Sequence, residues 1–345
     1  MRLEPPPVDD RSVWDVWLSV YRMPALAAAD ELGLFEALEA QPASADELGE
    51  RLGLNPQALR SVLPLLASLG FLAVREGRYH PTETARAYLL HDSPYYWGGA
   101  FSIHRADRHV ARFVAALKAD PAESLGAFGQ GSRPVDSWES GELGAELAQT
   151  LAAFMHSHSL PAAVGLARLA AFDGVRRLLD VGGGSGCFSI ALAQQRPRLH
   201  ATVMDLPAMT RLADRYIEDA GVRAQVDTRV VDMFRGAWPE GYDAIFMSNI
   251  FHDWNQDTCA VLAARSLEAL PPGGRILLHE MLLADDGSGP LAAAGFSMMM
   301  LAGTQGRQYS FSELARILTD AGFVDPQVTE AHGDFSLVSA RKPDR

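Results

Sequence analysis

A glycine-rich run followed by an acidic residue is the first feature of the chain with the makings of a chemical site. Residues 182–186 read Gly-Gly-Gly-Ser-Gly, directly after an apolar run that ends at Val181. Such a loop admits a ligand close to the backbone and presents helix N–H groups to an anion. Asp205 lies about 20 residues further on, where an acid hydrogen-bonds ribose hydroxyls. The run lacks the third glycine of the dinucleotide fingerprint and alone could be a plain tight turn, but with Asp205 it indicates a nucleoside-containing cofactor.

The elements that must position these residues alternate between strands and helices. Helical patterns at 188–195, 209–220 and 257–270 separate apolar runs at 175–181, 199–204, 226–231, 244–247 and 275–278. This alternation predicts an α/β fold with a parallel sheet, to which a helix at 310–321 and an antiparallel edge strand at 335–340 are added. Ligands bind beyond the carboxyl ends of such strands. The remaining residues expected there are Asp232, Met233, Ser248, Asn249 and His252.

The first half of the chain is predicted to be helical. Ser44 and Glu47 form a capping-box signature before a short helix that stops at Gly53, and Asn55-Pro56 opens the next helix. Residues 71–74 and 79–82 flank a charged turn and are typical of a small hairpin. Helix, turn, helix and hairpin make a winged-helix pattern.

Charge argues against DNA as the partner of this winged helix. The chain has 43 acidic and 30 basic residues, a net charge of −13, and residues 30–92 carry ten acidic residues against five arginines. Such a surface repels phosphate backbones and anionic lipid. The second helix presents Leu63, Leu65 and Leu66, which favours a dimerisation or packing role over a ligand-sensing regulator that reads DNA.

Length and composition indicate a folded, cytoplasmic protein without nucleic acid or membrane partners. At roughly 150 residues per domain, 345 residues predict two domains. Two cysteines, Cys187 and Cys259, make no disulfide framework and fit a reducing compartment. Residues 119–143 are rich in Gly, Ser and Pro, include Phe128 and Trp138, and form either a linker or a loop over a pocket. A helix is expected to follow over 143–169.

Six motifs in order make the sequence similar to a known family. They are Leu179-Asp-Val-Gly-Gly-Gly-Ser-Gly186, Asp205-Leu-Pro207, Asp232-Met-Phe234, His252-Asp-Trp254, Pro272-Gly-Gly274 and Ala321-Gly-Phe323. With the winged helix, they resemble the S-adenosylmethionine-dependent O-methyltransferases typified by plant caffeic acid and bacterial antibiotic-tailoring enzymes. The resemblance implies a Rossmann-like class I methyltransferase sheet, an N-terminal all-helical winged-helix dimerisation domain, and a homodimer. The expected segments are 1–100 for dimerisation, 101–170 for a linker and acceptor pocket, and 171–345 for catalysis.

The resemblance also implies which residues bind S-adenosylmethionine. Gly182 and Gly184 would line its methionine portion, Asp205 would hold the ribose, and Asp232 and Met233 would flank the adenine. Three more residues belong to the implied site, namely Leu206 beside Asp205, Ser159 on the preceding helix, and Ser248, where family members often have Lys or Arg.

His252 is the expected general base. Methyl transfer from a sulfonium is an in-line displacement, so the enzyme must align the nucleophile and remove its proton. A phenol titrates near about 10 and imidazole near about 6.5, so a neutral histidine within hydrogen-bond reach can take the proton as the oxygen attacks. Glu280 matches a family acid that orients this histidine through its other nitrogen.

One departure from the family pattern leaves an alternative open. Where the family commonly carries a second acid, the stretch Gly306-Arg-Gln-Tyr-Ser310 has Gln308. An amide can orient an imidazole but cannot stabilise an imidazolium by charge. C-methylation of an electron-rich aromatic or enolisable carbon is therefore the alternative to O-methylation of a small aromatic natural product.

The remaining site residues concern metal and acceptor. His279 is the second histidine nearest in motif context to His252 and Asp253, and strand alternation points it away from Glu280, so no metal is expected. Methionine and phenylalanine adapt to a flat aromatic acceptor. The sequence has no cluster of Lys or Arg that would bind a phosphate, so an acceptor with a phosphate group is not expected. The implied acceptor residues are Met155, Asp253, Phe296, Met299 and Met300.

Overall fold

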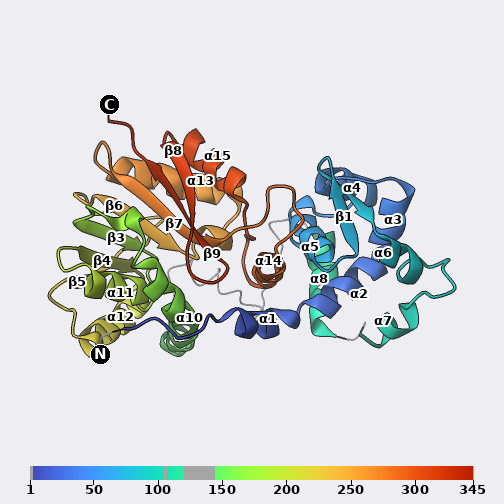
Figure 1. The fold of residues 1–345 in the computed structure, drawn as a ribbon, viewed down its shortest axis with the longest axis horizontal. Coiled ribbons are helices and arrows are strands. Elements are labelled where there is room, and N and C mark those ends of the chain that lie inside the picture. Colours follow the sequence, from blue (N-terminus) through green and yellow to red (C-terminus); the bar gives the residue numbers. More distant parts are fainter. Residues whose placement is uncertain (1–2, 105–106, 120–143, 345) are drawn as a thin grey trace. The chain divides into compact units, whose positions relative to one another are not determined.

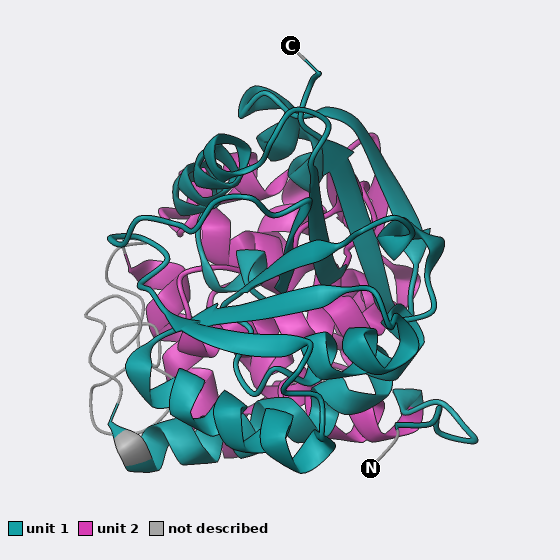
Figure 2. Cartoon of the chain, turned by 90° about the vertical axis from the view of Figure 1, so that its left-hand side faces the viewer, with its two compact units in different colours: residues 1–11, 136–280, 312–345 teal, residues 12–135, 281–311 magenta. Residues whose placement is uncertain are grey.

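The structure is a computed structural model that describes residues 3–104, 107–119 and 144–344. Most of the expected linker, with Phe128 and Trp138, lies outside the described residues. The chain divides into two compact units, one of residues 1–11, 136–280 and 312–345, the other of residues 12–135 and 281–311 (Figure 2). We call them unit 1 and unit 2. The predicted division at residues 100 and 170 stays a prediction.

Unit 2 is helical and contains the winged helix (Figure 1). Its elements are α1 (Arg11–Ser19), α2 (Arg22–Glu31), α3 (Leu34–Ala40), α4 (Ala45–Leu52), α5 (Pro56–Ser68), β1 (Leu72–Arg75), β2 (Arg78–Pro81), α6 (Glu83–Tyr88), α7 (Gly98–His104), α8 (Arg108–Lys118) and α14 (Leu291–Gly303). The capping box of Ser44 and Glu47 and the antiparallel β1–β2 hairpin are confirmed.

The leucine face of α5 is covered within the chain. Leu63, Leu65 and Leu66 are fully buried, and α5 packs on α14. Ser297 of α14 donates a hydrogen bond to Ser61 of α5 over 3.1 Å. Of the two roles expected for this face, the structure therefore assigns it packing within unit 2.

Unit 1 is a seven-stranded sheet with helices, in the strand order β5-β4-β3-β6-β7-β9-β8 (Figure 1). Its elements are α10 (Ala145–Leu166), η2 (Ala170–Phe172), β3 (Arg177–Val181), α11 (Cys187–Gln195), β4 (His200–Asp205), α12 (Pro207–Ala220), β5 (Val226–Val230), β6 (Ala244–Ser248), η3 (Phe251–Asp253), α13 (Gln256–Ala269), β7 (Arg275–Met281), α15 (Phe311–Asp320), β8 (Val324–Glu330) and β9 (Phe335–Arg341). The first five strands in this order pair in parallel, so the predicted α/β fold is confirmed.

The sequence prediction was wrong about which strand closes the sheet. The edge is β8, which pairs antiparallel with β9, so β9 lies inside the sheet. Strand β8 contains Pro326 and is mostly exposed, and the β8–β9 register shifts between Val324 and Gln327. Because proline and exposure are tolerated at an edge, the segment lacks the alternation that marks a half-buried strand.

Two further observations bear on composition. Cys187 and Cys259 are both free and buried. Within residues 3–104, 107–119 and 144–344, no helix is long and apolar enough to cross a membrane.

Candidate active site

The glycine run forms the turn between β3 and α11. Gly182, Gly184 and Gly186 have φ of 66°, 58° and 73°, a region that favours glycine. A Cβ on Gly182 would lie 2.5 Å from Cδ1 of Ile250. The loop therefore needs glycine both for its backbone conformation and for the approach of the segment that follows β6.

Asp205 is joined directly to this loop. Its Oδ2 accepts a hydrogen bond from the Gly184 N–H over 2.9 Å, and its Oδ1 accepts one from the Leu206 N–H over 2.7 Å. Desolvation raises the pKa of Asp205 to about 6, against the opposing effect of these two bonds. The two sequence features that indicated a nucleoside cofactor thus meet at one edge of the sheet.

Asp180, near the end of β3, lies against Gly183 of the loop. It was not assigned to the site from the sequence. Its carboxylate is buried, accepts a hydrogen bond from Ser189 Oγ over 2.6 Å, and would lie 2.7–2.9 Å from a Cβ on Gly183. Burial raises the pKa of Asp180 to about 7. Its place within the Leu179–Gly186 motif was the available signal.

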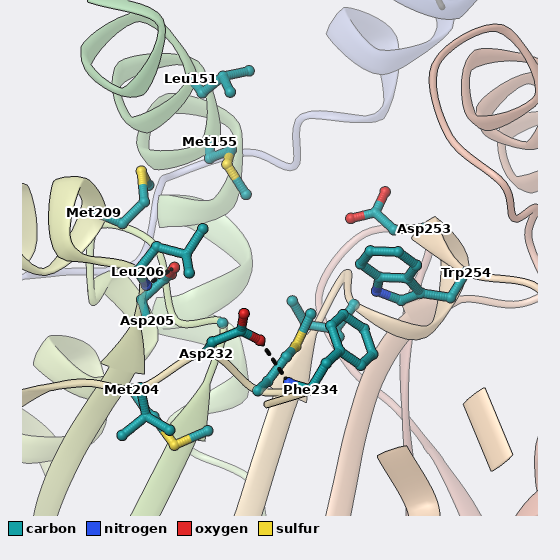
Figure 3. A pocket seen from close by; sticks show the side chains of 14 residues that line it. Leu151, Met155, Met204, Asp205, Leu206, Met209, Asp232, Phe234, Asp253 and Trp254 are labelled. Atoms are coloured by element: carbon teal, nitrogen blue, oxygen red, sulfur yellow. Dashed lines mark hydrogen bonds between the residues drawn. The ribbon is translucent and has the colours of Figure 1, made fainter. Parts of the chain in front are cut away.

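A pocket lined by 14 residues opens beside the glycine loop (Figure 3). Seven of the predicted residues line it, namely Met155, Gly182, Asp205, Leu206, Asp232, Met233 and Asp253. Sequence reasoning did not assign the other seven to the site: Leu151, Met204, Met209, Val231, Phe234, Ile250 and Trp254. Most of these adjoin a predicted residue in the chain, so proximity to the motifs could have indicated them.

The segment after β5 forms one wall of the pocket and is fixed by its own polar contacts. Asp232 Oδ1 accepts hydrogen bonds from the Phe234 N–H over 2.8 Å and the Arg235 N–H over 3.3 Å, the first of which is drawn in Figure 3. The rings of Phe234 and Trp254 meet edge to face, with centroids 4.7 Å apart.

Arg265 of α13 holds the same segment from outside the pocket and was missed from the sequence. Its guanidinium donates to the carbonyls of Phe234 and Gly236 and lies 5.5 Å from the ring centroid of Trp238. Trp238 in turn donates from Nε1 to the Met233 carbonyl over 2.9 Å. No motif marks Arg265, because these contacts depend on the packing of α13.

His252 lies in the 3-10 turn η3 with its side chain between two carboxylates. Its Nδ1 is 3.4 Å from Oε2 of Glu280, and its Nε2 is 3.7 Å from Oδ1 of Asp253. Glu280 Oε1 accepts hydrogen bonds from the N–H groups of Ile250 and Phe251, over 3.1 and 3.0 Å. His252 and Glu280 are both almost fully buried.

Burial disfavours the ionised forms of both Glu280 and Asp253. It raises the pKa of Glu280 to about 8, against the hydrogen bonds from Ile250, Phe251 and His252. Burial, and then the charge of Glu280, raise the pKa of Asp253 well above its usual range. An imidazole between two such groups can exchange a proton at the pocket wall, which Asp253 lines.

Glu280 lies inside β7, which extends beyond the apolar run predicted at 275–278. Strand β7 continues to Met281, and its alternation sends the side chains of Glu280 and His279 to opposite faces. His279 packs on Phe335, with ring centroids 4.6 Å apart, and is hydrogen-bonded through Nδ1 to Ser248 Oγ over 2.8 Å. Among the described residues, no group of three or more His, Cys, Asp or Glu side chains could hold a metal ion.

The remaining predicted residues lie outside this pocket lining. Ser159 is buried in α10 and Gly184 is next to the lining through Asp205. Phe296, Met299, Met300 and Gln308 belong to unit 2. Phe296 packs on Trp14 with ring centroids 5.4 Å apart, and the N–H of the fully buried Gln308 donates to Ser297 Oγ over 3.3 Å. Their approach to His252 stays a prediction.

Comparison with known proteins agrees with this fold and site. Residues 108–324 match the model of the O-methyltransferase domain, and residues 14–91 match that of the O-methyltransferase dimerisation domain. The fold and the pocket thus define a class I methyltransferase, and the chain belongs to the O-methyltransferase family. It is an S-adenosylmethionine-dependent enzyme that methylates a hydroxyl group.

Two curated relatives are similar over nearly the whole chain. The 3-hydroxy-5-methyl-1-naphthoate 3-O-methyltransferase of Streptomyces sahachiroi is 39% identical over 318 residues, covering 89% of this chain and 88% of that protein. The tetracenomycin polyketide synthesis 8-O-methyl transferase TcmO of Streptomyces glaucescens is 32% identical over 335 residues, covering 94% and 95%.

Two solved structures extend the comparison. An O-methyltransferase family 2 protein from Planctomyces limnophilus DSM 3776, in complex with apigenin, has a TM-score of 0.83 at 28% identity and covers 99% of this chain and 100% of its own. PigF with SAH has a TM-score of 0.60 at 25% identity, covering 97% and 100%.

The residues around the pocket fit S-adenosylmethionine. Gly182 brings backbone without a side chain to the pocket wall, and Asp205 supplies carboxylate oxygens for hydroxyl groups. Met233, Phe234 and Trp254 offer apolar surfaces to a flat ring.

Proposed function

We propose that this enzyme methylates a phenolic hydroxyl of a small aromatic natural product, with His252 as general base. The observation that carries the proposal is the placement of the buried His252 imidazole against Glu280, 3.4 Å away. S-adenosylmethionine, when bound, supplies an electrophilic methyl group on a sulfonium. What the chain must supply is alignment of the acceptor and removal of its proton.

In the proposed mechanism, His252 takes the phenol proton as the acceptor oxygen forms its new bond. Glu280 holds the imidazole by one edge through Nδ1, which leaves Nε2 as the nitrogen that receives the proton. Ionised Glu280, the form that predominates above its pKa of about 8, stabilises the imidazolium by its negative charge. Asp253, at 3.7 Å from Nε2 and on the pocket wall, would contact the acceptor beside the reacting oxygen.

The proposed cofactor site uses the residues around the glycine loop. Gly182 and Gly184 would line the methionine portion, Asp205 and Leu206 the ribose, and Asp232 and Met233 the adenine. Ser159 and Ser248 complete this proposed set. Support comes from the pocket, which five of these residues line and which Gly184 reaches through Asp205.

The acceptor is proposed to be a fused or substituted aromatic ring. The relatives named above act on a naphthoate and in the synthesis of a polyketide. Met155 lines the pocket, and we propose that Phe296, Met299 and Met300 of α14 also contact the acceptor. Family membership favours oxygen over carbon as the methylated atom.

A homodimer is the proposed assembly. The family's dimerisation model covers residues 14–91, and helix α1 with the residue that follows it, Val20, presents exposed apolar side chains. Val13, Val16 and Val20 are 69%, 72% and 51% exposed. A second copy of the chain that covers this face would remove it from water. The cytoplasmic location predicted from the cysteine content stays part of the proposal.

A labelled-methyl assay with polyketide and other phenols tests the function. Product analysis should find the methyl group on oxygen. His252→Ala should lower turnover at least about a hundredfold while S-adenosylmethionine affinity stays nearly intact. Near-normal turnover by this variant would contradict the role of His252, and a methyl group on carbon would revive the alternative reaction.

A further inference from the structure

Ser248 and His279 form an isolated polar pair at the cofactor edge of the sheet. They lie opposite each other in the parallel register of β6 and β7, and Ser248 Oγ is 2.8 Å from His279 Nδ1. On the other side of β6, Phe246 pairs with Asp180 of β3. Ser248 is the last residue of β6, and β3 ends at Val181, directly before Gly182 of the cofactor loop.

The rest of the His279 ring is enclosed by aromatic side chains. His279 is fully buried, stacks on Phe335 at an interplanar angle of 13°, and has the ring of Phe188 at 5.1 Å between centroids. Within the described part of the chain, its Nε2 has no hydrogen-bond partner. Burial, followed by the neighbouring His332, lowers the pKa of His279 to about 3, so the ring is neutral at working pH.

These surroundings select one tautomer of the neutral ring. A proton on Nε2 would leave a buried N–H donor without an acceptor, which is rare in proteins. A proton on Nδ1 is instead donated to Ser248 Oγ. With its oxygen accepting from His279, the Ser248 hydroxyl has its own proton available for a different acceptor.

We propose that His279 is a positioning residue that fixes the Ser248 hydroxyl as a hydrogen-bond donor toward the bound cofactor. The inference rests on the proposed place of Ser248 in the S-adenosylmethionine site. A neutral hydroxyl, held by a neutral imidazole, would donate a hydrogen bond without adding a positive charge beside a cationic cofactor.

The tautomer can be measured directly. In the ¹⁵N-labelled enzyme, the ring of His279, assigned by its loss in His279→Asn, should carry its proton on Nδ1. Its resonances should not titrate between pH 5 and pH 8. A proton on Nε2, or titration in that range, would overturn the proposal.

Cofactor binding gives an independent readout. Ser248→Ala and His279→Phe should each raise the calorimetric Kd for S-adenosylmethionine about three- to tenfold. The Kd of the double variant should be no higher than that of Ser248→Ala, because the two substitutions remove the same contact. His279→Asn, whose amide N–H can replace Nδ1–H, should restore most of the affinity.

A matched control separates this role from general loss of a buried hydrogen bond. Tyr242→Phe removes a buried bond of 3.0 Å to Thr202 in the same sheet and should leave the Kd unchanged. Additive losses, or wild-type affinity in His279→Phe, would refute the inference. Because turnover of His252→Ala tests the base separately, either proposal can fail alone.

Discussion

His252 and Glu280 meet although they lie in different elements, with Nδ1 of one 3.4 Å from Oε2 of the other. The contact depends on two backbone features. Because β7 continues to Met281, the side chains of Glu280 and His279 point to opposite faces of the sheet. At the start of η3, the N–H groups of Ile250 and Phe251 donate hydrogen bonds to Glu280 Oε1. Glu280 therefore fixes the turn through one oxygen and reaches the imidazole with the other.

Replacing Glu280 by Gln should lower kcat about ten- to a hundredfold, part of the contribution of a general base. The amide keeps an acceptor for the two backbone N–H groups but cannot stabilise the imidazolium by charge. The Kd for S-adenosylmethionine should not change. When Glu280→Gln is added to His252→Ala, kcat should fall little further than in His252→Ala alone, because the two residues act as a unit. Full additivity of the two losses would count against the proposed dyad.

The raised pKa of Glu280 makes the stability of the protein depend on pH in a defined direction. With a pKa of about 8 in the folded chain against an ordinary 4.5, the folded state binds more protons than the unfolded state between these values. Stability should therefore fall as pH rises from about 5 to 8 and depend little on this group below that range. Glu280→Gln removes the effect.

Thermal unfolding at two pH values checks this. The melting temperature of Glu280→Gln minus that of wild type is the quantity to compare. This difference should be at least about 3 °C more positive at pH 9 than at pH 5. Exposed Glu240→Gln serves as the control. A difference that does not change with pH would contradict the proposed ionisation of Glu280.

How much of this site could be predicted depended on whether the signal was local. The glycine loop, Asp205 and the strand–helix alternation are marked by short motifs and appear where expected. Strand β8 was missed because an exposed edge with Pro326 carries no hydrophobic alternation. Arg265 and the Ser248–His279 pair were missed because their partners come from elements brought together only by packing. Helix α14, which packs on α5, is likewise far away in the chain, with 236 positions between the hydrogen-bonded Ser61 and Ser297.

Cofactor binding should release protons near neutral pH. Burial raises the pKa of Asp180 to about 7 and that of Asp205 to about 6, so both are partly protonated in the free enzyme. A cationic ligand favours their ionised forms. Calorimetry at pH 6.5 in two buffers of different ionisation enthalpy should find release of about half a proton with S-adenosylmethionine. S-adenosylhomocysteine, which lacks the sulfonium charge, should release less, and equal release by both would refute the charge linkage.

Arg265 should matter for the cofactor but not for the chemical step. Arg265→Met keeps the aliphatic stem and removes both bonds to the carbonyls of Phe234 and Gly236. The Kd for S-adenosylmethionine should rise about five- to tenfold, with kcat at saturation within about twofold of wild type. The matched control is Arg223→Met, which removes an exposed ion pair to Asp214 and should have no effect. An unchanged Kd for S-adenosylmethionine in Arg265→Met would mean that the pocket wall formed by the segment after β5 keeps its structure without Arg265.

The exposed face of α1 should be needed for the homodimer. An aspartate at Val16 would bring a charge into the proposed interface, which would also contain Val13 and Val20, and buried unpaired charges are strongly destabilising. Light scattering after gel filtration should find wild type as a dimer and Val16→Asp largely as a monomer at about micromolar concentration. Val261→Asp changes a valine of α13 that is 49% exposed and should leave the dimer intact. Because the same face is exposed in the single chain, Val16→Asp should keep its circular dichroism spectrum; a folded variant that remains dimeric would place the interface elsewhere.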